Sequence, residues 1–546
     1  MNKPADDFDA IVVGSGHSGL VSAWYLSRAG LKVLVLEALD RVGGTNVTEE
    51  VFPGYSGSSV SNVSHSLDPH VASDMKLREF GLRTVEQSLS HFTLFANGKR
   101  FVTWQEREAR EEEIKALAVS DRDLPGFAEV PEFYRRVAQK MDVSFYDDAP
   151  SLDQVAAKFT TPREKSEFQK VIFGSVMDVL DDYLDSPELK AFLAGTSVAT
   201  NMVGPWTPGS GLTLLMRPLY EASMRRFGRV ERNDLMIKNS TPIGGVGAVT
   251  GAMAESARAR GVRYLLNAPV TQILVKDGSA AGVVLADGST YHAKTIVSNA
   301  NPQTTFASLI DPAVLDPDFL ERIHAIKMSG SSAKVHLALN GTPQFRAARS
   351  GYENELFVKA HFRTLPTTED MHQGYALAQT GRWAARPSLA AVISSAADPS
   401  LTPPGCHFVS ISVRGIPYHL AEGSWRDPAK REALITDVVD TFGEHVTNLS
   451  DILEGTHAYT PLDLEEKFGM AEGNGAHGDI VPSRFFDARP LPELAGYRTP
   501  VRGLYVCGVG VWPGNYMSGV TGFNASQRAL DDLAGHPDLA VDEVVG

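Results

Sequence analysis

Residues 8–37 read FDAIVVGSGHSGLVSAWYLSRAGLKVLVLE, and this stretch decides the fold. The apolar run at 8–13 is typical of a buried parallel strand. Residues 20–30 have the pattern of a helix closed by a glycine, and 32–36 form a second apolar strand. Strand, glycine-rich turn, helix and strand in this order predict the βαβ unit that opens a doubly wound α/β domain.

The turn between the first strand and the helix has three glycines, at Gly14, Gly16 and Gly19. Gly14 permits a tight turn, Gly16 lets the backbone approach a pyrophosphate, and Gly19 lets helix and strand pack closely. The helix N-terminus favours an anion. Glu37 ends the second strand, where a carboxylate accepts from ribose hydroxyls and disfavours the 2′-phosphate of NADP. We expect the dinucleotide to contact Gly14, Ser15, Gly16, His17, Ser18, Gly19, Glu37 and Ala38.

The residues after Glu37 favour FAD over NAD. The sequence Asp40-Arg41-Val42-Gly43-Gly44-Thr45 follows the second strand directly. An NAD domain has no need of Arg-x-Gly-Gly here, whereas the second half of a longer cofactor must run past this loop.

Two later parts of the chain fit the same domain. Residues 266–292 have the strands and glycine turns of a β-meander, and the strand at 295–298 ends at Asn299. Residues 503–508 form a strand that ends in glycine, and Gly519-Val520-Thr521-Gly522 opens a helix. The dipole of that helix would stabilise the negative charge of a reduced flavin.

This order of segments resembles the flavoprotein superfamily of amine oxidases and phytoene desaturases, whose members carry E-x₃-R-x-G-G after the second strand. Within it the chain is most similar to the phytoene-desaturase-like flavoproteins, including the desaturase-type β-carotene ketolases. The likeness covers nearly the whole chain. The stretches that carry it are 43–50, 208–211, 297–302, 398–407 and 485–492.

The resemblance implies FAD as the cofactor. It places Arg41, Gly43, Gly44 and Thr45 along the FAD phosphates and ribityl chain, and the backbone of Val270 at the adenine. It also places Asn299, Gly508, Gly519 and Val520 where the chain returns to the cofactor and meets the flavin. The implied activity is dehydrogenation or oxidation of an apolar or conjugated small organic substrate by hydride transfer to flavin, with dioxygen or a quinone as electron acceptor.

Departures from the family pattern mark candidate pocket residues. Trp512 stands where the family has histidine, and Tyr516 stands where it has a small residue. Tyr516-Met517-x-Gly519 is similar to the amine-oxidase pattern, in which the tyrosine forms one wall of an aromatic cage. Arg484 and His477 lie in a second departing stretch, where they could anchor or titrate a polar substrate. The alternative is that His477 is an ordinary loop histidine and Arg484 a solvated or paired arginine.

The fold class that follows is α/β, with a Rossmann-like FAD-binding domain of the amine oxidase and phytoene desaturase type. By motif position this domain comprises residues 1–75, 240–300 and 496–546. Residues 76–239 and 301–495 then supply an interleaved, mixed α+β substrate domain.

Composition excludes several classes. The chain has 546 residues with 66 acidic and 51 basic side chains, a formal charge of −15, so we expect no nucleic-acid partner. No apolar run reaches the ~18 residues of a membrane helix, and we expect a cytoplasmic protein without an integral membrane segment. The two cysteines, Cys406 and Cys507, exclude a disulfide scaffold, and no metal-ligand spacing is present. Cys507 lies on an apolar strand and is expected in the core.

Three other functions stay open. An FAD-dependent amine oxidase is favoured by Tyr516 and opposed by the desaturase-like stretches. A non-catalytic flavin-binding interaction protein is opposed by the retained glycines of the flavin loop, at Gly508, Gly514, Gly519 and Gly522. An NAD-linked dehydrogenase is disfavoured by the loop after Glu37. The substrate, the acceptor and the oligomeric state do not follow from the sequence.

Overall fold

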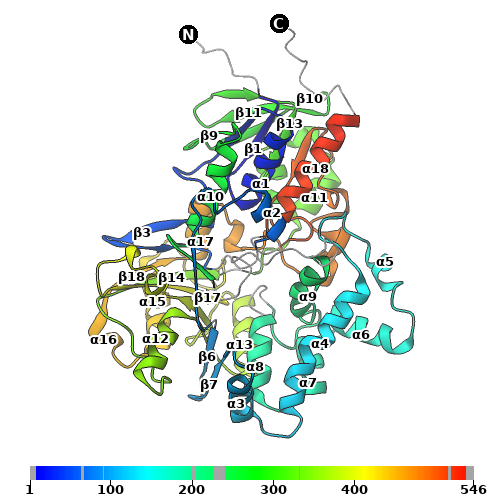
Figure 1. Cartoon of the computed structure of the whole chain (residues 1–546). Coiled ribbons are helices and arrows are strands. Elements are labelled where there is room, and N and C mark those ends of the chain that lie inside the picture. Colours follow the sequence, from blue (N-terminus) through cyan, green and yellow to red (C-terminus); the bar gives the residue numbers. More distant parts are fainter. Residues whose placement is uncertain are drawn as a thin grey trace.

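The computed structural model describes residues 8–62, 67–89, 91–197, 203–224, 240–330, 332–514 and 518–535. Figure 1 shows three parts: a sheet with helices at the top, a second sheet at lower left and a group of helices at lower right. The arrangement is α/β, and the predicted fold class is confirmed.

The upper part is built on a five-stranded parallel sheet with the order β19-β13-β1-β2-β9. The strands are β1 (Ala10–Val13), β2 (Val33–Leu36), β9 (Arg263–Leu265), β13 (Thr295–Ser298) and β19 (Leu504–Val506). Helix α1 (His17–Arg28) packs against α10 (Gly247–Arg258) and α18 (Val520–Gly535). The expected meander is also present, as β10 (Val270–Lys276), β11 (Ser279–Leu285) and β12 (Thr290–His292). The predicted βαβ unit and its returning strands are therefore confirmed.

The second sheet has seven strands in the order β18-β14-β17-β16-β15-β6-β7. They are β6 (His91–Phe95), β7 (Arg100–Val102), β14 (Ser332–Leu339), β15 (His361–Leu365), β16 (Leu389–Val392), β17 (His407–Arg414) and β18 (Leu453–Tyr459). One face of this sheet is apolar and shares a core with α12 (Gly351–Lys359) and α15 (Pro428–Gly443). The other face alternates with it and is polar, because successive side chains of a strand point to opposite sides.

The helical part has its own apolar core. Its helices are α3 (Arg107–Leu117), α4 (Asp123–Met141), α5 (Leu152–Ala156), α6 (Pro162–Phe173), α7 (Val176–Tyr183), α8 (Pro187–Ser197) and α9 (Leu212–Met224). Capping boxes at Ser151, Thr161 and Ser175 fix where α5, α6 and α7 begin.

Shorter elements connect these parts. They are β3 (Thr48–Phe52), β4 (Tyr55–Ser58), α2 (Pro69–Asp74), β5 (Thr84–Glu86), β8 (Ser240–Pro242), α11 (Pro317–His324), α13 (Thr368–Gln379), α14 (Ser394–Ala397), α16 (Leu449–Ile452) and α17 (Pro461–Phe468). The buried side chains between Phe306 and Met328 pack into the core of the five-stranded sheet, beyond the expected domain limit at residue 300. The division of the chain into two domains stays a proposal.

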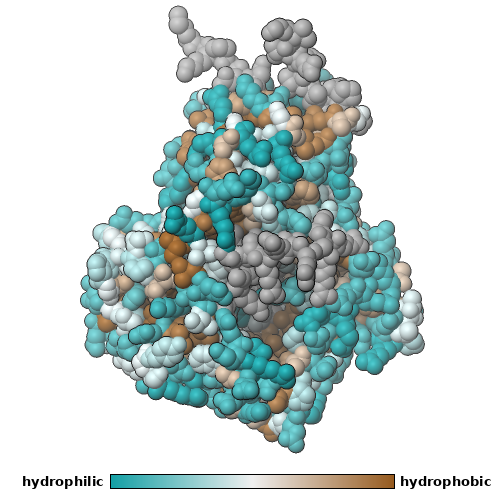
Figure 2. Space-filling model, in the orientation of Figure 1, coloured by the Kyte–Doolittle hydropathy of each residue, from teal (hydrophilic) through white to brown (hydrophobic). Residues whose placement is uncertain are grey.

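The surface in view is mainly hydrophilic, and its hydrophobic residues form small separate areas (Figure 2). In the parts of the chain that the structure describes, no helix combines the length and the apolar composition that crossing a bilayer requires.

Candidate functional site

Four segments that the sequence singles out meet at one edge of the five-stranded sheet. Because the strands are parallel, their carboxyl ends lie together. Gly14 follows β1, Glu37 follows β2, Asn299 follows β13 and Cys507 with Gly508 follows β19. The backbone confirms the meeting, since the Asn299 N–H donates to the Val13 carbonyl over 2.9 Å.

Backbone from two glycine turns forms a cradle at this edge. A methyl group added at Gly16 would lie 2.5 Å from Nδ2 of Asn299, and one at Gly19 would lie 2.2 Å from the Gly14 carbonyl oxygen. The second turn packs on the first: the Gly43 N–H donates to the Ser15 carbonyl over 3.1 Å, and a methyl group at Gly44 would lie 3.1 Å from Cα of Gly16. Side chains are therefore excluded from a surface that can approach phosphate groups closely.

Glu37 is held rigidly at one end of the cradle, where it is only 6% exposed. Its carboxylate accepts from the backbone N–H groups of Ser15 over 2.8 Å and Leu39 over 2.9 Å. Its carbonyl accepts from the Ala268 N–H over 2.8 Å, which brings the start of β10, and so Val270, to this end. Ala38 is exposed beside it. The structure thus brings the expected adenosine contacts together.

The other side chains of the two turns are tied to their surroundings. Nδ1 of His17 lies 3.2 Å from the Asn46 side-chain nitrogen, and the Thr45 carbonyl accepts from the Ser61 N–H over 3.1 Å. The Arg41 guanidinium pairs with Asp40 over 2.8 Å and with Glu49 over 2.9 Å, and it keeps 38% of its side chain exposed. Arg41 is thus placed beside the cradle and is engaged by two carboxylates.

The N-terminus of α18 lies against that of α1. A methyl group at Gly522 would lie 2.1 Å from the Ser18 carbonyl oxygen, and the Ser22 hydroxyl donates to the Gly522 carbonyl over 2.8 Å. Val520 is buried, and Gly519 has a φ of +78°, which favours glycine. Two helix N-termini therefore converge on the carboxyl edge, where both favour a negatively charged ligand.

Cys507 has no exposed surface, and burial raises the pKa of its thiol to about 12. Its sulfur lies 3.8 Å from Oδ1 of Asn299. It therefore packs as a core residue, as the apolar strand around it predicts.

The candidate pocket residues lie in different surroundings. Tyr516 lies outside the described residues. Trp512 is fully buried among Phe145, Phe485 and Phe486, with ring centroids 5.4 to 5.7 Å away, and presents no surface to a ligand in this structure.

Arg484 donates to the carbonyls of Pro490 over 2.9 Å and Ala325 over 3.4 Å, contacts that fit the paired-arginine alternative. His477 lies in a left-handed turn, and burial, aided by the nearby Arg489 guanidinium, lowers its pKa to about 4. Its imidazole is therefore neutral at neutral pH.

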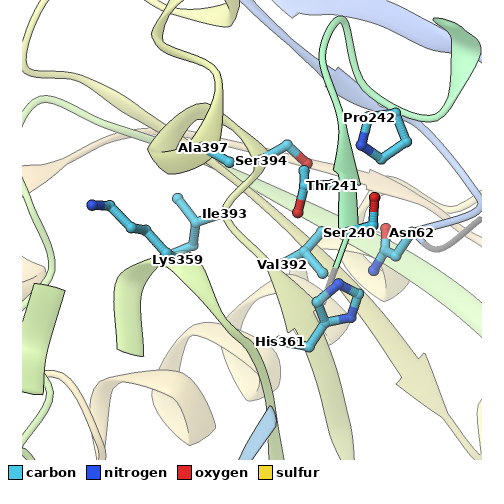
Figure 3. Close-up of a pocket in the computed structure, with 10 residues that line it drawn as sticks. All are labelled: Asn62, Ser240, Thr241, Pro242, Lys359, His361, Val392, Ile393, Ser394 and Ala397. Atoms are coloured by element: carbon cyan, nitrogen blue, oxygen red, sulfur yellow. The ribbon is translucent and has the colours of Figure 1, made fainter. Parts of the chain in front are cut away.

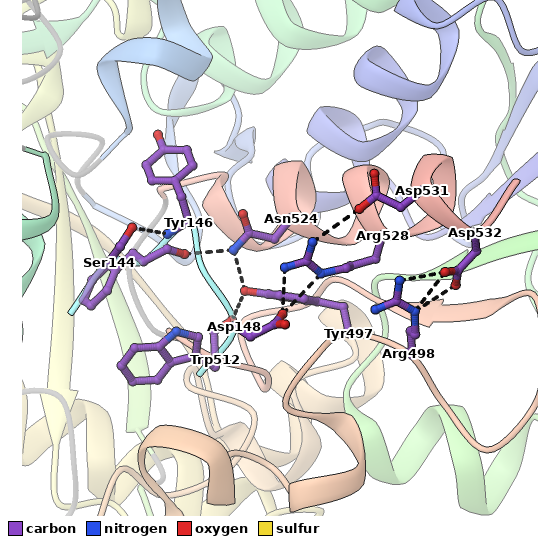
Figure 4. A network of polar contacts seen from close by, with 11 residues as sticks. Ser144, Tyr146, Asp148, Tyr497, Arg498, Trp512, Asn524, Arg528, Asp531 and Asp532 are labelled. Carbon is purple, nitrogen blue, oxygen red and sulfur yellow. Dashed lines mark hydrogen bonds and ion pairs between the residues drawn. The ribbon is translucent and has the colours of Figure 1, made fainter. Parts of the chain in front are cut away.

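Two arrangements hold the loop after β19. The buried Arg489 guanidinium donates to the carbonyls of Ala476 over 2.7 Å and Val509 over 3.0 Å. In Figure 4, the Tyr497 hydroxyl donates to the Trp512 carbonyl and accepts from the Asn524 amide of α18. These contacts fix α18 relative to the loop, and the sequence analysis did not single out Arg489, Tyr497 or Asn524.

The polar face of the seven-stranded sheet was also missed. Lys334 is 3% exposed, and its ammonium donates to Asn62 Oδ1 over 2.7 Å and to the Ser412 hydroxyl over 3.2 Å. Burial, with the nearby Arg414 adding to the effect, lowers its pKa well below the usual range. The segment that carries Asn62 pairs through Ser61 with Thr45, so the polar face connects directly to the cradle. The signal was present in residues 332–339, SAKVHLAL, where Ser, Lys and His occupy alternate positions.

The sequence matches a known family of proteins over most of its length. Residues 17–381 match the family described as flavin containing amine oxidoreductase. The chain belongs to this family of flavoprotein oxidoreductases.

Similar proteins and solved structures support this family membership. The chain is 30% identical to the Rattus norvegicus pyridine nucleotide-disulfide oxidoreductase domain-containing protein 2, over 96% of this chain and 94% of the other. It is 25% identical to a subunit of limonene dehydrogenase from Castellaniella defragrans, over 96% and 95%. Cyclohexylamine oxidase from Brevibacterium oxydans IH-35A has the same fold, with a TM-score of 0.58 at 17% identity over 97% and 100% of the two chains. The resemblance to desaturase-like flavoproteins is confirmed.

Membership in the flavin containing amine oxidoreductases implies a flavin cofactor, and the residues present fit one. A Cβ at Gly16, Gly19, Gly43 or Gly44 would lie 3.1 Å or less from neighbouring protein atoms, so this backbone must stay bare, and the N-termini of α1 and α18 lie at the same edge. The family thus implies a flavin-dependent oxidoreductase, and the fold and the carboxyl edge of the sheet fit such a cofactor.

Proposed function

We propose that this flavoprotein uses FAD to dehydrogenate or oxidise a small organic substrate. One observation carries the proposal: the cradle of Gly14, Gly16, Gly43 and Gly44 lies between the Glu37 end of the sheet and the N-terminus of α18. Such an elongated site fits a nucleotide that has an adenosine at one end, phosphates in the middle and a ring system at the other end.

Each end of the site has residues suited to one part of FAD. Glu37, Ala38 and Val270 would hold the adenosine, and the two glycine turns would hold the pyrophosphate. Gly508, Gly519 and Val520 would face the flavin ring, where the α18 dipole favours negative charge. When bound, FAD supplies the two-electron acceptor, which takes a hydride with its electron pair from the substrate and later passes the pair to dioxygen or a quinone.

Lys334 is the residue we propose for moving the accompanying proton. Burial lowers the pKa of the Lys334 amine and so favours its neutral form, which can accept a proton at Nζ. Asn62 and Ser412 fix the position of Nζ. Asn62 links Lys334 to the cradle, because its neighbour Ser61 donates to the Thr45 carbonyl.

Dehydrogenation is favoured over amine oxidation. The name of the Castellaniella relative assigns it a dehydrogenase activity. The polar face also carries Arg363 and Arg414 beside Lys334, and these cations would repel an ammonium group. The aromatic cage that favours an amine oxidase rests on Tyr516, which lies outside the described residues.

The test is anaerobic bleaching of the flavin by a panel of polyenes and hydroaromatic compounds, each with and without a carboxyl group, amines and reduced nicotinamide nucleotides. We expect bleaching by a polyene or a hydroaromatic compound, and recovery in air if dioxygen is a competent acceptor. Bleaching by amines alone would move the assignment to amine oxidase. An FAD-loaded protein that nothing in the panel bleaches would contradict the proposed activity.

A matched pair of variants tests the role of Lys334. Lys334→Met should keep FAD and slow bleaching by about 100-fold or more, the usual contribution of a general base. Lys276→Met replaces an exposed lysine at the end of β10, outside the seven-stranded sheet, and should bleach like the wild type. Equal rates for the two variants would remove Lys334 from the reaction.

A further inference from the structure

The polar face of the seven-stranded sheet places three cationic side chains together. Lys334 on β14 is paired with Ser412 on β17, two residues from Arg414. Ser412 is paired with Ala390 on β16, and Ala390 with Arg363 on β15. Because residues in register and residues two apart on a strand share a face, all three side chains point to the same side of the sheet. We call Lys334, Arg363 and Arg414 the cationic triad.

The triad has no carboxylate partner among the described residues. The positions in register with it, and those two residues away, hold Ser, Thr, His, Tyr, Ala, Val, Leu and Phe, and none of the described ones is Asp or Glu. The hydrogen bonds of the triad side chains go to neutral groups: Lys334 to Asn62 and Ser412, and Arg363 to the Thr196 hydroxyl over 2.8 Å. Within the described chain, the positive charges of Arg363 and Arg414 thus lie beside the Lys334 amine without a carboxylate to compensate them.

The surroundings make this arrangement costly. Arg414 has accessible surface, yet burial and the neighbouring Arg363 lower the pKa of its guanidinium to about 10. Burial also lowers the pKa of Arg363, which is half-buried. In this structure Arg414 is exposed and Arg363 is half-buried. Both arginines stay charged at neutral pH, and positive charge that the nearby protein desolvates is unfavourable unless a partner compensates it.

A small hollow, lined by more polar than apolar surface, opens onto the same face. Asn62, the partner of Lys334, lines this hollow together with His361 and Val392. His361 is two residues from Arg363 on β15, and Val392 is two residues from Ala390, the partner of Arg363 on β16, so both share the face of the triad. Figure 3 shows Asn62 and His361 at one side of the hollow and Lys359 at the other. Val392 and Ile393 give the hollow an apolar wall that can receive the carbon skeleton of a ligand.

We propose that the substrate is an organic acid, and that Arg363 and Arg414 bind its carboxylate. The guanidinium fork matches the two oxygens of a carboxylate, and the apolar wall fits the rest of the molecule. The triad is not one part of a generally basic protein, because the chain as a whole carries a formal charge of −15. This inference rests on the proposed function, since it names the substrate class for the same site.

The experiment is calorimetric titration of the oxidised holoprotein with octanoate, octanol, octylamine and octyl phosphate, which share one alkyl chain. We expect octanoate to bind and octanol and octylamine to bind at least about tenfold more weakly, since a charge-assisted contact contributes more than about 1.4 kcal/mol. Tighter binding of octyl phosphate than of octanoate would overturn the carboxylate assignment. Equal binding of octanoate and octanol would overturn the role of the triad.

Variants locate the binding. Arg414→Met and Arg363→Gln should each weaken octanoate binding by about tenfold or more. Arg386→Gln, at an exposed arginine that pairs with Glu444, is the matched control and should bind like the wild type. Arg414→Met should also unfold at the same or a higher temperature without ligand, because it removes an uncompensated charge. A marked loss of thermal stability in that variant would show a structural arginine and overturn the inference.

The two proposals fail separately. A holoprotein whose flavin is bleached by neutral substrates, and which does not bind octanoate, would overturn the inference and leave the oxidoreductase activity standing. A protein that binds octanoate through Arg414, and whose FAD no member of the panel reduces, would leave the anion site standing and overturn the activity.

Discussion

Cys507 and Lys334 are both buried, and burial changes their chemistry in opposite ways. The neutral form is favoured in each case, so the thiol pKa of Cys507 rises to about 12 and the pKa of Lys334 falls well below its usual range. A neutral thiol is a poor nucleophile, whereas a neutral amine is a competent base. The same physical cause therefore lowers the reactivity of Cys507 and would suit Lys334 to the proposed role of a base.

Thiol labelling tests this reading of Cys507. A native sample treated with iodoacetamide at about pH 9.5 should label Cys406, which is half-buried, and leave Cys507 unlabelled, since alkylation requires the thiolate. Both should react after unfolding. The measurement is the mass of peptides from native and unfolded samples, with Cys406→Ser as the control that should show no native label. Rapid native labelling of Cys507 would contradict its place in the core.

Among the elements, α18 depends most on close approach to a neighbour. Gly522 lets it pack on α1, while Asn524 ties it to Tyr497 and to the Phe145 carbonyl. This packing sets where the helix N-terminus lies relative to the cradle. The position of the α18 N-terminus thus depends on the small size of Gly522 and on the hydrogen bonds of the Asn524 amide.

Two glycines of α18 form a matched pair for a test of this packing. Gly522→Ala should destabilise the protein by roughly 1–3 kcal/mol and reduce its FAD content, because the added methyl group meets the Ser18 carbonyl. Gly535→Ala adds its methyl group where no atom of the described residues lies within 4 Å and should be neutral or slightly stabilising. Thermal unfolding and FAD content of both variants are the measurements. Similar losses in both would contradict the packing argument.

Sequence reasoning predicted the elements whose signals are local. The strand, the three glycines, α1 and Glu37 lie within one βαβ unit, so their spacing alone places them at the carboxyl edge. Trp512 was different, because the residues that bury it include Phe145, which comes from a loop of the helical part. Local departure from a family pattern carries no information about such distant neighbours.

The cationic triad was out of reach for the same reason. Alternation in residues 332–339 shows that Lys334 and His336 share a face, but it does not show that β17 and β15 add arginines to that face. The pairing joins strands that are 29 to 80 residues apart, and only the folded sheet brings the three cations together. Register between distant strands is the part of the site that sequence patterns did not supply.

At the scale of the whole molecule, two sheets divide the work. The five-stranded sheet offers a carboxyl edge with two glycine turns and two helix N-termini, and the seven-stranded sheet offers a face that carries Lys334, Arg363 and Arg414. The segment that carries Ser61 and Asn62 joins them, since Ser61 pairs with Thr45 of the cradle and Asn62 binds Lys334. The cofactor and the substrate would therefore be held by different layers that meet along one short stretch of chain.

The most direct test of this account is the FAD content of the purified protein, measured by mass spectrometry of the nucleotide released on denaturation. The wild type should release FAD in an amount equal to the amount of chain. Gly19→Ala should release almost none, because its methyl group would lie 2.2 Å from the Gly14 backbone carbonyl oxygen and force the turn open, and Gly251→Ala, whose methyl group meets no described atom within 4 Å, should match the wild type. Release of NAD in place of FAD, or full FAD retention by Gly19→Ala, would contradict the account.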